Sequence, residues 1–398
     1  MKNYHISDNM KNMKPSAIRE IFKSLTDPTI ISFAAGNPSP ASFPADELAR
    51  ISADIYQKEA AAALQYGITE GYTPLREAVS ARLSCKFGIG RDFDSTIIVT
   101  GGQQGIDLTC RVLCNPGDVV ICENPSFIGA LNAFRSNGAK LVGIEMEEDG
   151  LNVGKLEEAL RTYPNVRMLY LIPTFQNPSG TCMSLEKRKQ VYALARRYNT
   201  IILEDNPYGE LRFSGEELPT FKSMDDDGIV VYCSSFSKIL SAGMRVGFLC
   251  APESIMQKIV VAKQCSDVHT NLFFQMLCYH YMTECNMDAH VASIRELYRR
   301  KCALMLSELD KSMPVDVKYT RPEGGLFLWA TLPDSVPLQA FVARLIEKKV
   351  AVVPGVAFNC DEEAPSSSFR MNYSTPSDEE IIKGVELLSG TAKEMLAN

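Results

Sequence analysis

The sequence has little of several features that mark whole classes of protein. Its 398 residues include only four histidines, at positions 5, 269, 280 and 290, and these are not spaced as metal ligands. The net charge is −7, so no basic excess points to nucleic acid. No apolar run approaches the roughly 20 residues of a membrane span, and the charged N-terminus lacks the apolar core of a signal peptide. We therefore expect no metal, no nucleic acid and no membrane partner.

Cysteine, in contrast, is plentiful, with twelve copies. The cysteines are scattered, and none forms a CxxC motif. Cys122 and Cys250 end apolar runs, and Cys110 and Cys114 stand four residues apart on an expected helix. Scattered cysteines in apolar surroundings are typical of reduced, buried thiols. This pattern predicts a cytoplasmic protein.

From residue 96 onward, short apolar, β-branched runs alternate with helical stretches. The seven runs lie at 96–100, 119–122, 141–144, 168–172, 201–203, 229–232 and 246–250. Such alternation predicts a mainly parallel sheet with helices on both faces. The link from Ser237 to Met244 is shorter than the roughly dozen residues that a parallel crossover needs, so the last strand should run antiparallel. We predict an α/β fold with a seven-stranded, mostly parallel sheet and one antiparallel strand.

The flanking sequence predicts further elements. Before the sheet, residues 1–45 read as irregular, with a short amphipathic stretch at 18–22 and an extended piece at 31–38. A helix follows at 46–63, and another runs to Phe87 with Thr73 as N-cap and Gly88 as its stop.

After the sheet, a long helical pattern at 288–313 leads into a mixture of strands and helices. The strands are expected at 318–319, 326–329, 350–353 and 369–373, and the helices at 338–348 and 378–396. Ser377 and Glu380 form a capping box for the final helix. A chain of this length suggests two domains. We predict an N-terminal segment (1–45) that packs with the small domain and the active site, a large cofactor-binding domain (46–290) and a small α+β domain (291–398).

Polar residues and glycines follow several of the predicted strands. They are Gly101, Gly102 and Gln103 after the first strand, Phe127 after the second, Asn177 after the fourth, Asp205 and Tyr208 after the fifth, and Lys238 after the sixth. Each alone has a plain explanation, such as a tight turn, a core aromatic or a surface lysine. Ligands of open α/β sheets bind beyond the carboxyl ends of the strands, however, so these residues should converge. Together they meet the needs of pyridoxal 5′-phosphate: a lysine for a Schiff base, a carboxylate for the ring nitrogen, donors for the ring oxygen and a phosphate site.

These motifs resemble a known family. Ser235-Phe236-Ser237-Lys238 with Arg245, Asn177-Pro178-Ser179-Gly180 and the segment from Asp205 to Tyr208 are similar to those of the fold-type I pyridoxal-phosphate aminotransferases of classes I and II. Within them, the sequence resembles the α-aminoadipate/kynurenine/aromatic aminotransferase group over nearly the whole chain.

The resemblance implies a role for each residue of the site. Lys238 would be the Schiff-base lysine and proton shuttle, and Asp205 and Tyr208 would complete the catalytic set. Asp205 would pair with the ring nitrogen, Asn177 and Tyr208 would bond the ring oxygen, and Phe127 would stack on the ring. The phosphate would be held by Gly102, Gln103, Ser235, Ser237 and Arg245, with Tyr66 reaching the phosphate of the neighbouring subunit of a homodimer. The substrate would be bound by Gly36, Asn177, Arg370 and Arg19, with Arg370 clamping the α-carboxylate.

Two positions depart from the family's pattern. Phe127 stands where relatives often have tyrosine, and Gly102 stands where many carry a hydroxyl residue. At Phe127 stacking survives but a hydroxyl contact is lost, and at Gly102 only the backbone N–H remains; neither change rules out the cofactor.

The implied reaction is a ping-pong transamination between an L-amino acid and a 2-oxo acid. Two other functions stay open. The same cofactor contacts would serve a carbon–sulfur β-lyase. A pyridoxal-phosphate-binding regulatory module would also resemble this chain, but such regulators carry an N-terminal DNA-binding domain, and only about 45 residues precede the first large-domain helix here. The preferred amino donor, whether acidic, aromatic or broad, is also left open.

Overall fold

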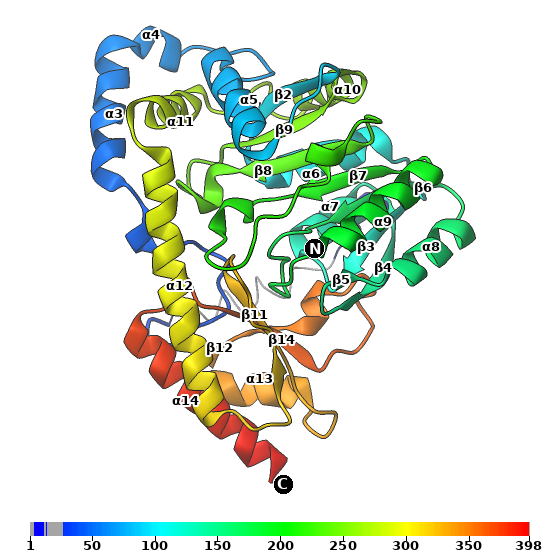
Figure 1. Cartoon of the computed structure of the whole chain (residues 1–398), viewed down its shortest axis with the longest axis vertical. Helices are drawn as coiled ribbons and strands as arrows, with labels where there is room; N and C mark the ends of the chain where they lie inside the picture. The colour runs from blue at the N-terminus through cyan, green and yellow to red at the C-terminus, as the bar shows by residue number, and fades with distance from the viewer. Residues whose placement is uncertain (1–3, 12, 14–26, 398) are drawn as a thin grey trace.

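The structure is a computed structural model that describes residues 4–11, 13 and 27–397. Within these residues the central sheet has eight strands in the order β2-β9-β8-β7-β6-β3-β4-β5 (Figure 1). The strands are β2 (Asp94–Val99), β3 (Val119–Asn124), β4 (Lys140–Glu147), β5 (Gly150–Leu151), β6 (Val166–Leu171), β7 (Ile201–Asp205), β8 (Val230–Ser235) and β9 (Gly247–Pro252).

The strand directions follow the prediction closely. Strands β4, β3, β6, β7 and β8 are parallel, and β9 runs antiparallel to both of its neighbours, β8 and β2. The prediction of seven strands was one short, because β5 adds a second antiparallel strand at the β4 edge. A two-residue strand is too short to show a periodic pattern, so the sequence gives no sign of it.

Alternate residues of each strand point to opposite faces of the sheet, and each face packs against its own helices. Ile121 and Ile202 share one apolar cluster with helices α8 (Val153–Thr162) and α9 (Leu185–Arg197). Cys122 and Leu203 belong to the other cluster, with α6 (Gly101–Leu113) and α7 (Ile128–Ser136). Asp205 shares the parity of Leu203 and therefore lies on the α6/α7 face.

The helices before the sheet depart from the prediction in two places. The expected helix at 46–63 breaks at Glu59 into α3 (Ala45–Lys58) and α4 (Ala60–Ala63). Thr73 is the first residue of α5 (Thr73–Phe87) rather than its N-cap, since Tyr72 takes that position without a side-chain cap. The stop is as predicted, because Gly88 adopts a left-handed φ of 64° that favours glycine.

The long helix α12 (Met287–Ser312) connects the large sheet to a second, smaller one (Figure 1). Helices α10 (Glu253–Gln264) and α11 (Leu272–Glu284) precede it. The small sheet has the antiparallel order β10 (Lys318–Tyr319), β11 (Phe327–Thr331), β14 (Ser368–Asn372), β13 (Val353–Pro354). Helices α13 (Leu338–Glu347) and α14 (Asp378–Leu396) complete this part, and the capping box of Ser377 and Glu380 is confirmed.

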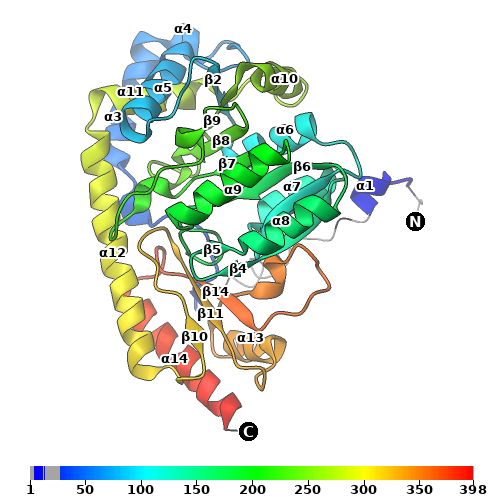
Figure 2. The same ribbon diagram turned by 45° about the vertical axis from the view of Figure 1, so that its right-hand side comes forward.

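The N-terminal segment reaches both parts of the molecule. Strand β1 (Ile31–Ser32) pairs in parallel with β12 (Val350–Ala351) of the small part. The short helix α1 (Asp8–Lys11), which the irregular reading of 1–45 missed, lies against α7 (Figure 2). The predicted amphipathic stretch at 18–22 lies outside the described residues. The division of the chain at residues 45 and 290 stays a prediction.

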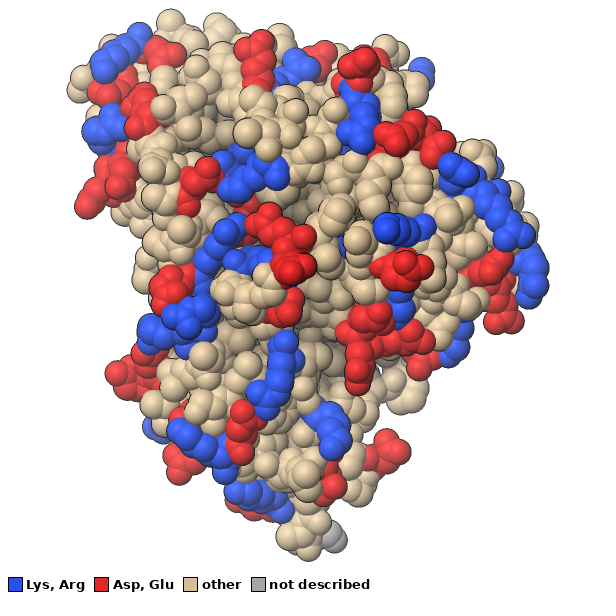
Figure 3. Space-filling view, viewed as in Figure 1, with Lys and Arg blue, Asp and Glu red and all other residues tan. Residues whose placement is uncertain are grey.

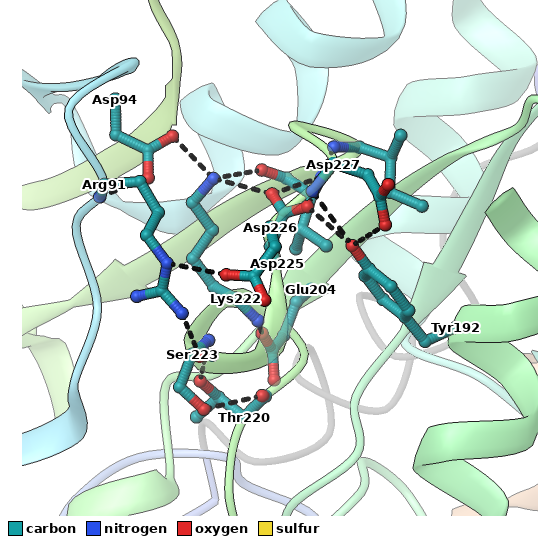
Figure 4. Close-up of polar contacts among 12 residues, drawn as sticks. Arg91, Asp94, Tyr192, Glu204, Thr220, Lys222, Ser223, Asp225, Asp226 and Asp227 are labelled. Atoms are coloured by element: carbon teal, nitrogen blue, oxygen red, sulfur yellow. Dashed lines mark hydrogen bonds and ion pairs between the residues drawn. The ribbon is translucent and has the colours of Figure 1, made fainter.

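A buried lysine anchors the loop that follows β7 (Figure 4). The Lys222 Nζ donates to Asp94 at 2.6 Å and to Asp225 at 2.9 Å, and both the Lys222 and the Asp225 side chains are fully buried. Glu204, one residue before Asp205, accepts hydrogen bonds from the backbone N–H groups of Phe221 and Lys222. The loop and the carboxyl end of β7 are therefore fixed to each other.

The surface shows no single dominant charge on the face seen in Figure 3, where acidic and basic side chains alternate. All twelve cysteines lie among the described residues and are free, and seven of them are buried. In the part of the chain that the structure describes, no helix is both long and apolar enough to span a membrane, and no cluster of three or more His, Cys, Asp or Glu residues could hold a metal.

Candidate active site

A cavity of about 440 Å³ opens at the carboxyl ends of the parallel strands, between the two sheets. Its lining comprises Gly36, Asn37, Gly102, Gln103, Ile106, Phe127, Ile172, Asn177, Asp205, Pro207, Tyr208, Ser235, Ser237, Lys238, Ala242, Arg245, Phe327 and Arg370. The structure thus brings together all the predicted site residues except Tyr66 and Arg19.

Lys238 enters this cavity from a single 3-10 turn, Phe236–Lys238, directly after β8. Ser235 caps the turn by accepting a hydrogen bond from the Ser237 N–H at 3.0 Å, and the Lys238 Nζ donates to the Gly36 carbonyl at 2.8 Å. The pKa of Lys238 is lowered to about 8, chiefly by burial and also by the nearby cations Arg370 and Arg245, while the charge of Asp205 opposes the shift. A larger fraction of this amine is therefore neutral and nucleophilic near neutral pH than of an exposed lysine.

Asp205 ends β7 with 4% of its surface exposed. The Tyr170 hydroxyl donates to its Oδ2 at 2.6 Å. The pKa of Asp205 is raised to about 6, because burial outweighs the Tyr170 hydrogen bond and the charge of Lys238, which both lower it. The sequence analysis did not single out Tyr170. The available signal was its place in the apolar run 168–172, where a buried tyrosine hydroxyl needs a hydrogen-bond partner.

The start of α6 forms an anion cradle with Arg245. The side chain of Thr100, the N-cap, does not cap the helix, because its hydroxyl bonds to Asp267 at 2.7 Å. Gly102 and Gln103 border the cavity, and as first-turn residues of α6 their N–H groups have no acceptor within the helix. Gly101 has a φ of +74°, a left-handed conformation that favours glycine, and a Cβ there would collide with the Arg245 guanidinium where it closes over the helix start.

Arg370, on β14, is 3% exposed and held in a fixed plane. Its Nη1 donates to Asn177 Oδ1 at 2.8 Å and its Nη2 to the Ala34 carbonyl at 2.9 Å. The rings of Phe327 and Phe358 lie 4.2 and 5.0 Å from the guanidinium carbon. Its buried Nε has no hydrogen-bond partner among the described residues. One N–H on each of the two terminal nitrogens also has no hydrogen-bond partner among the described residues, and these two donors are left for a carboxylate.

The side-chain amide of Asn177 contacts Arg370 through its oxygen and Tyr208 through its nitrogen. The Asn177 Nδ2 donates to the Tyr208 hydroxyl at 3.4 Å, and burial raises the pKa of Tyr208, which keeps the phenol protonated. Gln176 holds this turn in place, because its side chain donates to the Pro125 carbonyl at 2.8 Å and accepts from the Ser179 N–H at 2.8 Å. The loop that precedes Phe127 and the turn that carries Asn177 are thereby joined.

Two predicted residues are not among those that line the cavity. Tyr66 is 81% exposed, with its ring edge-on to His269 at 5.8 Å, and it does not line the cavity of its own chain. Arg19 lies outside the described residues. Besides Tyr170, the sequence reading missed Gln176, Phe327 and Phe358. The two phenylalanines come from the small part of the molecule, and no local sequence signal places them beside Arg370.

The cavity thus combines a buried amine of lowered pKa, a buried carboxylate, an anion cradle and an arginine with unpaired donors. Similarity to known proteins identifies the family. The aminotransferase class I and II family model matches residues 28–388. Aromatic-amino-acid aminotransferase 1 of Thermococcus litoralis is 39% identical over 98% of this chain and 94% of its own.

Two solved structures are similar along nearly their whole length. The kynurenine aminotransferase of Pyrococcus horikoshii, in complex with PMP, superposes with a TM-score of 0.95 at 38% identity and covers 98% of this chain and 97% of its own. The α-aminoadipate aminotransferase LysN of Thermus thermophilus, complexed with N-(5′-phosphopyridoxyl)-L-leucine, gives a TM-score of 0.90 at 36% identity and covers 98% of each chain. The chain belongs to the class I and II aminotransferase family, in its aromatic/aminoadipate/kynurenine group. It is a transaminase, and pyridoxal phosphate is the cofactor of its family.

Proposed function

We propose that this protein moves the amino group of an L-amino acid to a 2-oxo acid in two half-reactions, with pyridoxal 5′-phosphate held covalently by Lys238. The observation that carries the proposal is the convergence of Lys238, Asp205 and Arg370 on one cavity that also contains an anion cradle. When bound, the cofactor supplies an electron sink that acidifies the substrate α-carbon.

The residues present fit that group. The glycine at 101 is needed for Arg245 to close over the first turn of α6, as a phosphate site requires. The phosphate would be held by Gly102, Gln103, Ser235, Ser237 and Arg245. Asp205 would hold the ring nitrogen, Asn177 and Tyr208 the ring oxygen, and Phe127 one ring face.

The remaining groups of the cavity act on the substrate. Arg370 binds the α-carboxylate through the remaining N–H groups of its two terminal nitrogens, and Gly36 and Asn177 line the space beside it. Lys238, with a pKa of about 8, takes a proton from the substrate α-carbon as a general base. We further propose that Arg19 contacts the substrate side chain. If Arg19→Ala leaves the preference between acidic and aromatic donors unchanged, that contact is refuted.

We also propose that the chain acts as a homodimer with shared sites. Tyr66 and two apolar neighbours, Leu64 and Ile68, are 81%, 73% and 54% exposed. Exposed apolar residues that lie together favour a protein contact. In this arrangement the Tyr66 hydroxyl reaches the partner's phosphate cradle, so Tyr66→Phe should weaken cofactor binding without changing the fold.

The decisive experiment is an absorption spectrum of the protein with pyridoxal phosphate, before and after amino acids are added without any oxo acid. A visible band that fades with particular amino acids and returns with a 2-oxo acid supports the proposal and reveals the donor class. Lys238→Ala should lack both the band and turnover. Pyruvate and ammonia released without a co-substrate would indicate a β-lyase. A band that never fades, without any product, would indicate a ligand sensor, and the absence of a band would refute the cofactor.

A further inference from the structure

Tyr170 lies behind the cavity and is not among the residues that line it. It is fully buried in β6, and its ring packs edge-on against Phe134 with the centroids 5.2 Å apart. The β6–β7 register pairs Tyr170 with Leu203, so the ring shares the face of the sheet on which Leu203 and Asp205 lie. From there its hydroxyl donates to Asp205 Oδ2 at 2.6 Å.

Among the described residues, Tyr170 is the one side chain that hydrogen-bonds the Asp205 carboxylate. One oxygen is thereby held from behind the site, while Asp205 itself lines the cavity. A buried carboxylate stays charged only where a donor or a cation favours the charged form. Lys238 is the nearby cation, but it is also the residue that would join the cofactor. Tyr170 is therefore the partner that does not change during the reaction.

Other titratable groups lie close enough to interact with Asp205. Besides Lys238 they are Glu123 at the end of β3, Tyr208 after β7 and Cys233 on β8. None of these groups donates a hydrogen bond to the carboxylate among the described contacts. Their charges, where present, are negative and would disfavour a charged Asp205, which makes the Tyr170 hydroxyl the fixed donor that opposes them.

We propose that Tyr170 is a positioning residue that, through its hydroxyl, keeps Asp205 charged and aimed at the cofactor's ring nitrogen, so that this nitrogen stays protonated. The inference rests on the proposed function. Without the Tyr170 hydroxyl, the buried Asp205 carboxylate would be a stronger base. The proton between Asp205 and the ring nitrogen would then shift from the nitrogen to the Asp205 oxygen. The pair then becomes neutral, and the ring withdraws electrons less strongly.

The variant that isolates this effect is Tyr170→Phe, since it keeps the ring packed on Phe134 and removes one oxygen. Tyr232→Phe is the matched control. Tyr232 is a buried tyrosine of the same sheet, 2% exposed, whose hydroxyl accepts a hydrogen bond from Asn206 at 3.2 Å. Its pairing with Glu204 places it on the opposite face of the sheet from Asp205.

The first measurement is the nitrogen-15 chemical shift of ring-labelled pyridoxal phosphate bound to the wild type and to both variants. We expect the Y170F signal to move toward the value of neutral pyridine, with kcat lower by on the order of tenfold, the effect of a lost hydrogen bond to a charged group. The KM for the amino acid should stay within about twofold, because the Arg370 clamp is untouched. Y232F should match the wild type. A Y170F protein with the wild-type shift and kcat, or equal losses in both variants without a change in shift, would overturn the inference.

A second measurement replaces the ring nitrogen with carbon. The dissociation constants of pyridoxal phosphate and of its 1-deaza analogue are compared in wild type and Y170F. We expect Y170F to weaken binding of the natural cofactor and to leave the analogue unaffected, since the analogue has no nitrogen for Asp205 to hold. Equal weakening of both would indicate a packing role and overturn the inference. If the wild type itself binds neither compound, the proposed function fails, and this outcome is distinct from a failure of Tyr170 alone.

Discussion

Arg370 and Asn177 are separated by 193 residues in the chain, yet the Arg370 Nη1 donates to Asn177 Oδ1 at 2.8 Å inside the cavity. The other end of the same amide reaches the Tyr208 hydroxyl. One side chain therefore connects the proposed carboxylate clamp on the small sheet with the proposed ring contacts on the large one. The groups proposed to bind the substrate and the cofactor are therefore fixed relative to each other before either molecule binds.

The first prediction concerns the shape of this clamp. Arg370→Lys keeps the charge and loses the planar fork that can bind a carboxylate through two parallel hydrogen bonds. We expect the KM for the amino acid to rise by about 10- to 100-fold, with a smaller change in kcat, as measured by steady-state kinetics. Arg344→Lys on α13, where the arginine side chain is 55% exposed, is the control and should leave KM unchanged. A normal KM in the Arg370 variant would contradict the assignment.

The second prediction contrasts two adjacent glycines in the anion cradle. A Cβ at Gly102 would meet only the Cys233 Sγ, at 3.7 Å, which is ordinary contact. Gly102→Ser should therefore fit and add a hydroxyl donor, tightening pyridoxal phosphate binding by up to about tenfold. Gly101→Ala should instead weaken binding by about tenfold or more, because it collides with Arg245 and strains a left-handed residue. Titration of cofactor-free protein measures both, and a similar response to the two substitutions would argue against the cradle.

Sequence reasoning succeeded where the signal is local and failed where it depends on register. The seven apolar runs predicted the strands, because a strand buried on both faces is apolar along its length. The short link after Ser237 predicted the reversed direction of β9, because it is too short for a parallel crossover. Asp205 and Lys238 could be placed because both follow directly from a strand end. Tyr170 could not, because its role depends on which residue of β7 stands opposite it, and β6 and β7 are joined through a long crossover. Phe358 lies beside Arg370 because the 3-10 turn Gly355–Phe358 packs against β14 within the small part of the molecule, a tertiary contact that no local pattern predicts.

The third prediction is a pH dependence. An aldehyde reacts with the neutral form of an amine, and burial lowers the pKa of Lys238 to about 8, below the value of about 10.4 for an unperturbed lysine. The rate at which cofactor-free protein captures pyridoxal phosphate should therefore rise with pH and level off above an inflection near 8. Arg370→Met removes a cation that lowers this pKa, so its inflection should move to higher pH. Stopped-flow absorbance between pH 6 and pH 10 tests both, and an inflection above pH 10 in the wild type would contradict a buried amine.

The last prediction concerns stability and tests the anchor behind β7. Lys222→Met has a similar shape but leaves Asp94 and Asp225 buried without their cation, and removing one partner of a buried ion pair costs about 3–5 kcal/mol. We expect the free energy of unfolding in urea to fall by about that amount. Lys155→Met, which breaks an exposed pair with Glu145, should leave the urea midpoint unchanged. Equal midpoints for the two variants would contradict a stabilising role for the buried ion pairs of Lys222. Adding pyridoxal phosphate should partly restore the Lys222→Met protein, because a ligand that binds only the folded state stabilises it, and Glu204 ties the altered loop to the strand that carries Asp205.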